Sequence, residues 1–255
     1  RDAIKMLTVN AASGFGSGGG GYTANAVAFD GTNDYLTRGA DIGGSDGKQM
    51  ICSFWVNFTG GDGTLMKIFS TSNDRFYIER QADNKFKMVS KKTDGSTWMY
   101  VMSSTTTTVS DGWTHIMWYI RADHPTNPGH VRLFIDGVNT GQTGSGGGDA
   151  TMDWTSADWA IGATTAGGEK LEAEIADFYL ITGFYLTLET ESEIRKWRSA
   201  DGKPVNLGDD GSEPSGSTPQ IYFTGETASW HTNVGSGGGF TENGALTDGA
   251  SSPSD

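Results

Sequence analysis

Three acidic side chains within one short stretch, EAEIADF, have a spacing that suits the hydrolysis of a glycosidic bond. They are Glu172, Glu174 and Asp177. Side chains two residues apart point to the same face of a strand, and a retaining glycosidase needs two carboxyl groups about 5–5.5 Å apart. However, Phe178 and Leu180 give the same segment the alternation of an ordinary strand with one side in the core. We favour the structural strand and expect no catalytic residue, so the chain is not expected to be an enzyme.

Aromatic side chains are the second set of candidates, because the apolar face of a sugar ring stacks on an exposed indole or phenol ring. Trp98 and Tyr100 are two residues apart and are predicted to share one strand face. Trp154 lies in MDWTSADW, a stretch rich in polar partners for hydroxyl groups, and Trp159 follows it. The alternative for these residues is the core, where most tryptophans of a β-sandwich lie. We take Trp98, Tyr100, Trp154 and Trp159 as the candidate glycan-binding residues.

The other reactive side chains indicate neither a metal centre nor a nucleic-acid surface. The histidines, at positions 115, 124, 130 and 231, share no metal-ligand spacing, and His115 is expected to be structural. The net charge is −13, and acidic residues flank the densest group of lysines, at 85–92, so no nucleic-acid partner is expected. Cys52 is the single cysteine, which excludes an intrachain disulfide. No apolar run has the length of a transmembrane helix, so no membrane insertion is expected.

The segment GSGGG occurs three times, at residues 16–20, 144–148 and 235–239. A phosphate-binding loop needs a helix directly after the glycines and a lysine that reaches the phosphates, and no copy has both. The first and third copies lead into an aromatic residue followed by Thr-x-Asn, at Tyr22 and Phe240, which a free linker would not carry. We predict that these glycines allow positive φ or close approach to a neighbour while the aromatic ring docks. The middle copy is predicted to be a loop.

Alternation of apolar and polar residues dominates the chain and predicts many short strands. They are expected at 50–58, 64–70, 75–80, 85–92, 97–102, 113–121, 129–137, 158–162, 174–182 and 221–225. Turn-forming stretches such as KTDGS and SDGW separate them, which is typical of a β-sandwich or jelly roll. One short helix is predicted to begin at Thr190, in a capping box with Glu193, and to stop at Asp201–Gly202.

Four segments in the same order resemble the laminin-G-like domains of the concanavalin-type jelly rolls. They are FDGTNDYLTRG (29–39), DGWTHIMWYIR (111–121), VRLFIDGVNTG (131–141) and the closing strand and helix at 159–194. The resemblance implies an all-β, concanavalin-like (laminin-G-like) jelly-roll sandwich with one short helix. We place the jelly roll at residues 25–203, between an ordered N-terminal arm (1–24) and a C-terminal arm (204–255) with one strand and a Gly-rich segment.

The same resemblance bears on the acidic residues. It implies that Glu172, Glu174 and Asp177 lie at an exposed bulge of the closing strand. Their order is Glu, Glu, Asp, whereas the jelly-roll glycoside hydrolase class with this spacing has Glu, Asp, Glu. Laminin-G and pentraxin relatives often hold Ca²⁺ on loop oxygens, and no other cofactor is expected. The candidate ligands here are Asp41, Asp46, Asp62, Asp136, Asp209 and Asp210, although Asp136–Gly137 equally fits a hairpin turn.

The flanks resemble structural proteins of tailed bacteriophages, at residues 235–246 and 251–255. The resemblance implies a non-enzymatic virion protein that decorates the capsid or the tail at the virion surface. Its expected partners are other virion proteins, copies of itself and cell-surface glycan. Tyr22, Trp230 and Phe240 are the predicted anchors of the assembly arms. One alternative is a soluble carbohydrate-binding lectin domain, with or without calcium, and another is a glycoside hydrolase built on the three acids.

Overall fold

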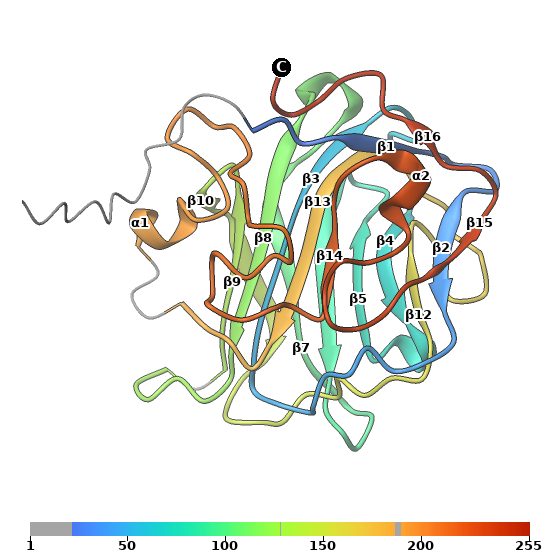
Figure 1. Cartoon of the computed structure of the whole chain (residues 1–255). Coiled ribbons are helices and arrows are strands. Elements are labelled where there is room, and N and C mark those ends of the chain that lie inside the picture. Colours follow the sequence, from blue (N-terminus) through green and yellow to red (C-terminus); the bar gives the residue numbers. More distant parts are fainter. Residues whose placement is uncertain (1–21, 128, 187–189) are drawn as a thin grey trace, which may run out of the picture.

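The alternating residues build two antiparallel sheets that pack face to face (Figure 1). The computed structural model describes residues 22–127, 129–186 and 190–255. Side chains on the inner faces of both sheets form one large core cluster. The predicted all-β jelly-roll sandwich is confirmed. Residues 1–21, which include most of the predicted N-terminal arm and the first GSGGG copy, lie outside the described residues.

The first sheet has the strand order β10-β9-β8-β3-β13-β1-β16, and β14 also pairs with β13. Its long central strands match the predicted runs closely, because each run alternates over its whole length. The strands are β1 (Ala26–Asp30), β3 (Gln49–Phe58), β8 (Thr114–Arg121), β9 (His130–Ile135), β10 (Val138–Asn139), β13 (Glu172–Thr182), β14 (Ile221–Phe223) and β16 (Thr247–Asp248).

The second sheet has the order β11-β7-β6-β5-β4-β12-β2-β15. Its strands are β2 (Tyr35–Arg38), β4 (Met66–Thr71), β5 (Phe76–Arg80), β6 (Lys85–Lys91), β7 (Thr97–Thr106), β11 (Gly141–Gly146), β12 (Trp159–Ile161) and β15 (Thr241–Asn243). The middle GSGGG copy was predicted to be a loop, but its first three residues belong to the edge strand β11. A glycine-rich edge strand needs only backbone hydrogen bonds to β7, so it leaves no apolar alternation in the sequence.

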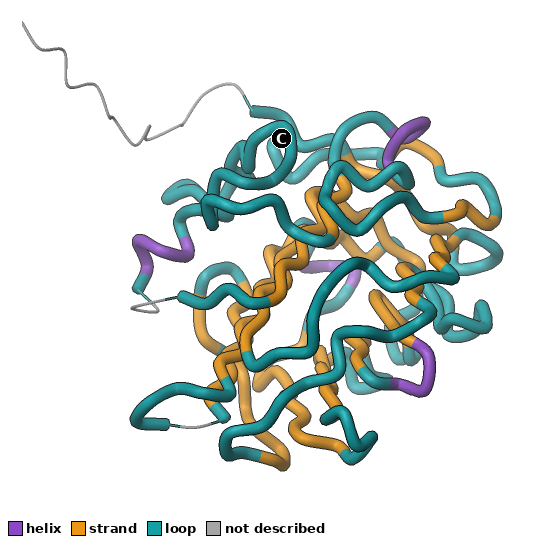
Figure 2. Tube along the Cα trace, turned by 60° about the horizontal axis from the view of Figure 1, so that its bottom comes forward, coloured by secondary structure: helices purple, strands orange, loops and turns teal. Residues whose placement is uncertain are grey.

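Helices are short turns between the strands (Figure 2). They are α1 (Glu191–Ile194), α2 (Thr227–Trp230) and the 3₁₀ turns Ser72–Asp74 and Val109–Asp111. The predicted helix exists as α1 but is shorter than expected, and the capping box does not form because the Thr190 hydroxyl lies 2.8 Å from Ser192 Oγ. None of the helices in the described ranges has the length and apolar character needed to cross a membrane.

A second apolar cluster covers the outer face of the first sheet. Strands β3, β8, β9 and β13 contribute its floor, and α1 with the chain that follows contributes its cover. Ile194 and Trp197 come from the cover, as their shared helical face predicts, and Tyr179 comes from the floor. Consequently this face of the sheet is closed to solvent along most of its width.

The C-terminal segment, residues 204–255, belongs to the sandwich (Figure 1). Strands β14, β15 and β16 pair with β13, β2 and β1, so the segment contributes three strands where one was predicted. The two missed strands are too short and polar to show alternation. Trp230 and Phe240 are buried, and both rings pack against Phe223 at centroid distances of 4.9 and 5.0 Å. These two predicted anchors therefore dock on their own chain.

The third GSGGG copy confirms the prediction that its glycines approach neighbouring backbone. A Cβ on Gly237 would lie 2.5 Å from the Gln220 carbonyl oxygen, and one on Gly235 would lie 2.7 Å from that of Pro219. Gly238 has a φ of +79°. The Asn233 side-chain amide donates to the carbonyl oxygens of Gln220 and Gly238 and so holds the loop in place.

Candidate functional site

Two of the three acidic residues of β13, Glu174 and Asp177, are covered by the C-terminal segment, whereas Glu172 is half-buried. Glu174 is 2% exposed, and its carboxylate accepts hydrogen bonds from Asn57 Nδ2 at 3.0 Å, the Ala250 amide at 2.5 Å and Ser251 Oγ at 3.2 Å. The expectation of an exposed bulge is therefore wrong for Glu174. The reason is that the last residues of the chain fold back over β13, a contact between positions that are far apart in the sequence.

Asp177 occupies the predicted bulge but is also buried, at 4% exposed. The pairing of β13 with β3 shifts register between Ala176 and Tyr179, and Asp177 has a φ of +48°. Its carboxylate accepts hydrogen bonds from the hydroxyls of Tyr22, at 2.9 Å, and Thr224, at 2.7 Å. Burial raises the pKa of this carboxyl to about 6, and the two hydroxyl hydrogen bonds oppose the shift. Glu174 and Asp177 thus bind chain segments and present no open pair of carboxylates.

Three of the four candidate glycan-binding residues lie in the core. Trp98, Trp154 and Trp159 are at most 3% exposed, so their ring faces are covered by other side chains. Trp98 and Tyr100 do not share a face, because the register between β6 and β7 shifts at Ser90 and Lys91. Such a bulge adds one residue to a strand and turns Trp98 inward beside its neighbour in sequence.

Tyr100 remains on the outer face of the second sheet, where it shares a row with Tyr77. Residues Tyr77, Val89 and Tyr100 pair directly across β5, β6 and β7. Both tyrosines are half-buried, and Val89 between them is only 5% exposed. Their sequence neighbours Phe76 and Met99 point into the core. The two rings therefore flank an apolar floor on the outer surface of the sheet.

Charged side chains form the next row of the same surface. Lys67, Glu79 and Lys87 are paired in register across β4, β5 and β6. Lys67 Nζ is in close contact with the Glu79 carboxylate, and Lys87 Nζ lies 3.5 Å from the same carboxylate. Lys87 Nζ is also 5.8 Å from the Tyr77 ring centroid and 6.0 Å from that of Tyr100. We call these residues, Lys67, Tyr77, Glu79, Lys87, Val89 and Tyr100, the tyrosine face.

The electrostatics of the tyrosine face keep the Tyr77 phenol neutral. Burial, followed by the negative charges of Glu79, Asp74 and Glu169, raises the pKa of Tyr77 well above its ordinary value. Its hydroxyl can therefore donate or accept a hydrogen bond at any physiological pH. The Tyr77 ring is also in contact with a cation, because Lys67 Nζ lies over the ring, 3.7 Å from its centroid. Lys67 and Glu79 are buried beneath the ring, so the accessible part of the face combines tyrosine ring surface with the Lys87 ammonium group, a combination suited to binding a polar ligand.

Tyr77, Glu79 and Lys87 were not among the residues proposed from sequence. The signal was present, because FYIER and KFKMVSK alternate and place these three side chains opposite the buried Phe76, Ile78 and Met88. What the sequence did not contain was the register that brings β5, β6 and β7 into one row. Tryptophan is the usual platform for a sugar ring, but seven of the eight tryptophans of this chain are buried.

The six candidate calcium ligands are dispersed, and five of them, all except Asp209, have local partners among the described residues. Asp62 pairs with Arg80 at 3.1 Å, Asp46 accepts a hydrogen bond from the Trp154 amide, and Asp41 accepts one from the Gly43 amide. Asp210 binds Ser212 and Thr218, and Asp136 forms the tight turn between β9 and β10 with a φ of +52°. No group of three or more His, Cys, Asp or Glu side chains that could hold a metal gathers among the described residues.

The sequence and the fold were compared with known proteins. Residues 30–189 match the model of the concanavalin A-like lectin/glucanases superfamily. The chain belongs to this superfamily. The comparison with curated proteins finds no match. As a member of the superfamily, the chain has a lectin-like fold of the carbohydrate-binding type, in agreement with the order of motifs in its sequence.

Two solved structures illustrate the likeness of fold. A SAP-like pentraxin from Limulus polyphemus, described as a native heptamer, is 16% identical to this chain, with a TM-score of 0.55. The match covers 89% of this chain and 95% of the pentraxin chain. A putative carbohydrate-binding protein from Bacteroides ovatus is 11% identical with a TM-score of 0.62. That match covers 91% of this chain and 62% of the Bacteroides protein. At these identities the likeness concerns the fold.

Proposed function

We propose that the chain is a carbohydrate-binding module that recognises a saccharide through the tyrosine face and catalyses no reaction on it. The observation that carries this proposal is the row of Tyr77, Val89 and Tyr100 on the outer face of the second sheet, with charged side chains alongside. The superfamily is consistent with it, since it includes lectins. The Bacteroides relative, described as a putative carbohydrate-binding protein, has the same fold.

The arrangement fits the two needs of sugar recognition. The carbon-rich face of a pyranose can lie on the ring of Tyr77 or Tyr100 above Val89. Lys87 Nζ, which lies within 6.0 Å of both ring centroids, can donate to a hydroxyl group of that sugar. Glu79 is buried and pairs with Lys87, so it holds the Lys87 ammonium group in position. Ring stacking and charge-assisted hydrogen bonds together give orientation as well as affinity.

The proposal that the chain catalyses no reaction rests on how the carboxylates of Glu174 and Asp177 are bound. A retaining glycosidase needs two carboxyl groups facing one bond of a bound sugar. Here the carboxylates of Glu174 and Asp177 are hydrogen-bonded to the chain itself and enclosed by it. The hydrolase alternative is therefore the least favoured of the three.

The test is a glycan array followed by calorimetry on the hits. Tyr77→Ala and Tyr100→Ala should each raise Kd at least tenfold, which is about 1.4 kcal/mol. The matched control is Tyr185→Ala, because Tyr185 also carries a cation on its ring, with Arg121 3.8 Å from the centroid, but lies with the second apolar cluster on the first sheet. If no glycan binds, or if the two variants bind as tightly as the parent, the proposal fails.

The predicted role in a virion stays a prediction. Trp230 and Phe240, expected to anchor the chain on other virion proteins, pack on Phe223 of the same chain, and Tyr22 binds Asp177. The two structures described above are not presented as viral proteins. Imaging native particles for repeated copies of this chain would test the role and the location at the virion surface. A carbohydrate-binding module is compatible with that location.

A further inference from the structure

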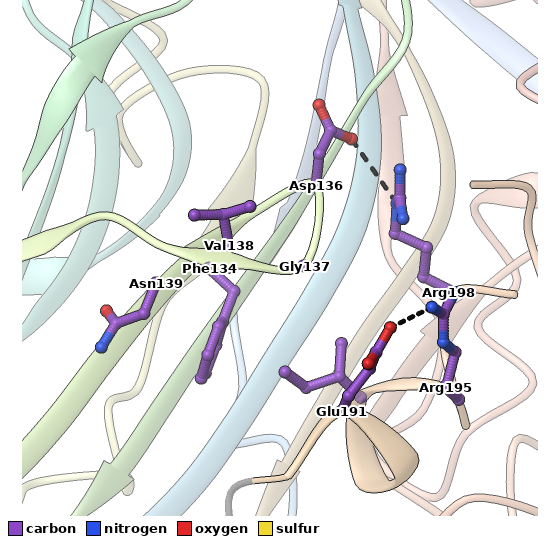
Figure 3. A pocket seen from close by; sticks show the side chains of 9 residues that line it. Phe134, Asp136, Gly137, Val138, Asn139, Glu191, Arg195 and Arg198 are labelled. Carbon is purple, nitrogen blue, oxygen red and sulfur yellow. Dashed lines mark hydrogen bonds and ion pairs between the residues drawn. The ribbon is translucent and has the colours of Figure 1, made fainter. Parts of the chain in front are cut away.

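A cavity of about 420 Å³ lies between the β9–β10 hairpin and α1 (Figure 3). The hairpin belongs to the first sheet, whereas the tyrosine face lies on the second. Its volume falls within the range of small-molecule sites, about 300–1,000 Å³. The hairpin supplies Phe134, Asp136 and Val138 to its wall, and Glu191, Arg195 and Arg198 come from α1 and the turn after it. The wall thus combines two guanidinium groups, two carboxylates and an apolar side.

The two arginines differ in how their hydrogen-bonding capacity is used. Arg195 pairs closely with Glu191 one helical turn earlier and donates to the Ser199 carbonyl oxygen. Arg198 has only an ion contact, from Nε to Asp136 Oδ1 at 3.6 Å, and no residue of the described chain accepts a hydrogen bond from its guanidinium. Its Nε is moreover buried without a hydrogen-bond partner. A planar guanidinium with unused donors is matched to a carboxylate, which can bind it through two parallel bonds.

Asp136 does not fill this role for Arg198 in this structure. Its Oδ1 already accepts a hydrogen bond from the His115 backbone amide at 3.1 Å, and the tight turn fixes its position. The distance of 3.6 Å is too long for a hydrogen bond. The donors of Arg198 therefore remain available to a group that enters the cavity.

We propose that this cavity binds a monoanionic polyhydroxylated ligand, a hexuronate, with its carboxylate on Arg198. The carboxylates of Asp136 and Glu191 repel a second negative charge, which disfavours sulfate, phosphate and dicarboxylates. The same two carboxylates can accept hydrogen bonds from hydroxyl groups. Phe134 and Val138, which is 64% exposed, offer an apolar wall to the carbon skeleton of the ring. The net charge of −13 gives no general attraction for anions, so binding depends on the local arrangement.

The test is a titration of the whole chain with glucuronate, with glucose as the neutral counterpart and sulfate as the bare anion. The arginine Nε–Hε signal of Arg198 is followed by NMR, and affinities are measured by calorimetry. We expect glucuronate to shift this signal and to bind at least tenfold more tightly than glucose or sulfate. Equal binding of glucose, tighter binding of sulfate, or an unmoved Arg198 signal would overturn the proposal.

The variants are Arg198→Gln, Arg198→Lys and the matched control Arg75→Gln, which removes a guanidinium that pairs with Asp153 just before β5. Arg198→Gln should weaken glucuronate binding at least tenfold. Arg198→Lys, which keeps the charge and loses the planar fork, should weaken it at least threefold, and the control should stay within twofold. Unchanged binding by both Arg198 variants contradicts the proposal. If Arg198→Gln does not fold, the lysine variant and the NMR shift decide.

Two further measurements distinguish a glycan terminus from a free sugar acid, and binding in the cavity from binding at the tyrosine face. An oligosaccharide ending in glucuronate that binds more tightly than the free acid identifies a glycan terminus, and equal affinities identify the free sugar acid. Both results support the site. The Nε–Hε signal of Arg198 reports on this cavity alone, because the cavity lies against the first sheet and the tyrosine face lies on the second. Failure of that face to bind sugar would therefore leave this proposal standing.

Discussion

The Tyr22 hydroxyl lies 2.9 and 3.0 Å from the two carboxylate oxygens of Asp177, a residue 155 positions later in the chain. Asp177 sits at the bulge of β13, where the partner strand changes from β1 to β14. Thr224, which directly follows β14, donates to the same carboxylate at 2.7 Å. One buried carboxyl group therefore joins the chain entering β1 to the chain leaving β14.

This carboxyl group should make the protein less stable as the pH rises through the acidic range. Burial raises the pKa of Asp177 from 3.8 to about 6 in the folded state, so the folded state keeps its proton where the unfolded state has lost it. The stabilising contribution is complete below the unfolded pKa and is lost as the pH rises through 6. The loss is about 3 kcal/mol. The free energy of unfolding is measured in urea from pH 4 to pH 8 for the parent and for Asp177→Asn.

Asp177→Asn is the control for the parent protein, because the asparagine side chain does not titrate. The difference between parent and variant should shift by about 2.4 kcal/mol against the parent between pH 4 and pH 7. A difference that stays constant with pH, or one that favours the parent at higher pH, contradicts the assignment. The carboxyl signal of Asp177, followed by NMR, gives the folded pKa directly.

His115 should have the opposite effect on stability. Burial, with a smaller contribution from the positive charge of Arg198, lowers the pKa of His115 from 6.5 to about 3. The folded state therefore holds a neutral imidazole while the unfolded state binds a proton below pH 6.5. Stability is complete above the unfolded pKa and is lost as the pH falls towards 3, by about 3 kcal/mol at pH 4.5.

The variant for this test is His115→Gln, which removes the titration and retains a side-chain amide near Ser53, whose hydroxyl lies 2.8 Å from His115 Nε2. The variant is expected to lose stability at pH 7 and to resist acid better, relative to its own maximum, than the parent. Acid unfolding curves of the two proteins that run parallel from pH 7 to pH 4 would refute the role of His115.

Removing one charge of the buried pair Lys67–Glu79 beneath Tyr77 should destabilise the protein, whereas replacing both residues by apolar ones should be tolerated. Both residues are buried, and Glu79 is in close contact with Lys67. Glu79→Gln leaves the Lys67 ammonium with only Glu169, at 3.6 Å, and should cost about 3 kcal/mol. Lys67→Met combined with Glu79→Leu removes both charges and should recover most of that loss. Urea unfolding of the parent, Lys67→Met, Glu79→Leu and the double variant gives the coupling energy, and additive losses would contradict the pairing.

Local alternation predicted most of the strands of this fold and the two-residue turn at Asp136–Gly137. The pattern works because each strand of the sandwich has one face in the core. The last residues of the chain cover β13. This contact was not predictable from alternation, since it depends on which distant segments meet. The Ala250 amide and the Glu174 carboxylate are an example, because neither residue carries a signal for the other.

The candidate site was predicted only in part, because it too depends on which distant segments of the chain lie side by side. Tyr100 was predicted because it is an aromatic residue two positions from Trp98, whereas a role for Tyr77 depends on the register of β5, β6 and β7. The bulge that turns Trp98 inward is also invisible in an alternating sequence. Burial of Phe240 after the glycine-rich segment was predicted correctly, because an aromatic residue directly after glycines is unusual for a linker.

The glycine-rich segment before Phe240 should tolerate no side chain at Gly237. A Cβ there would lie 2.5 Å from the Gln220 carbonyl oxygen and 2.8 Å from that of Ile42, and both atoms belong to backbone that is held in place. Gly237→Ala should therefore destabilise the protein by about 1–3 kcal/mol through overpacking. The matched control is Gly39→Ala, where the nearest atom to a new Cβ is a side-chain oxygen of Asp158 at 3.8 Å, and it should change stability by less than about 0.5 kcal/mol. Thermal and urea unfolding of both variants measure the difference. Equal stability of the two would mean that residues 235–239 lie on the surface as a flexible linker, and the burial of Phe240 would then need another cause.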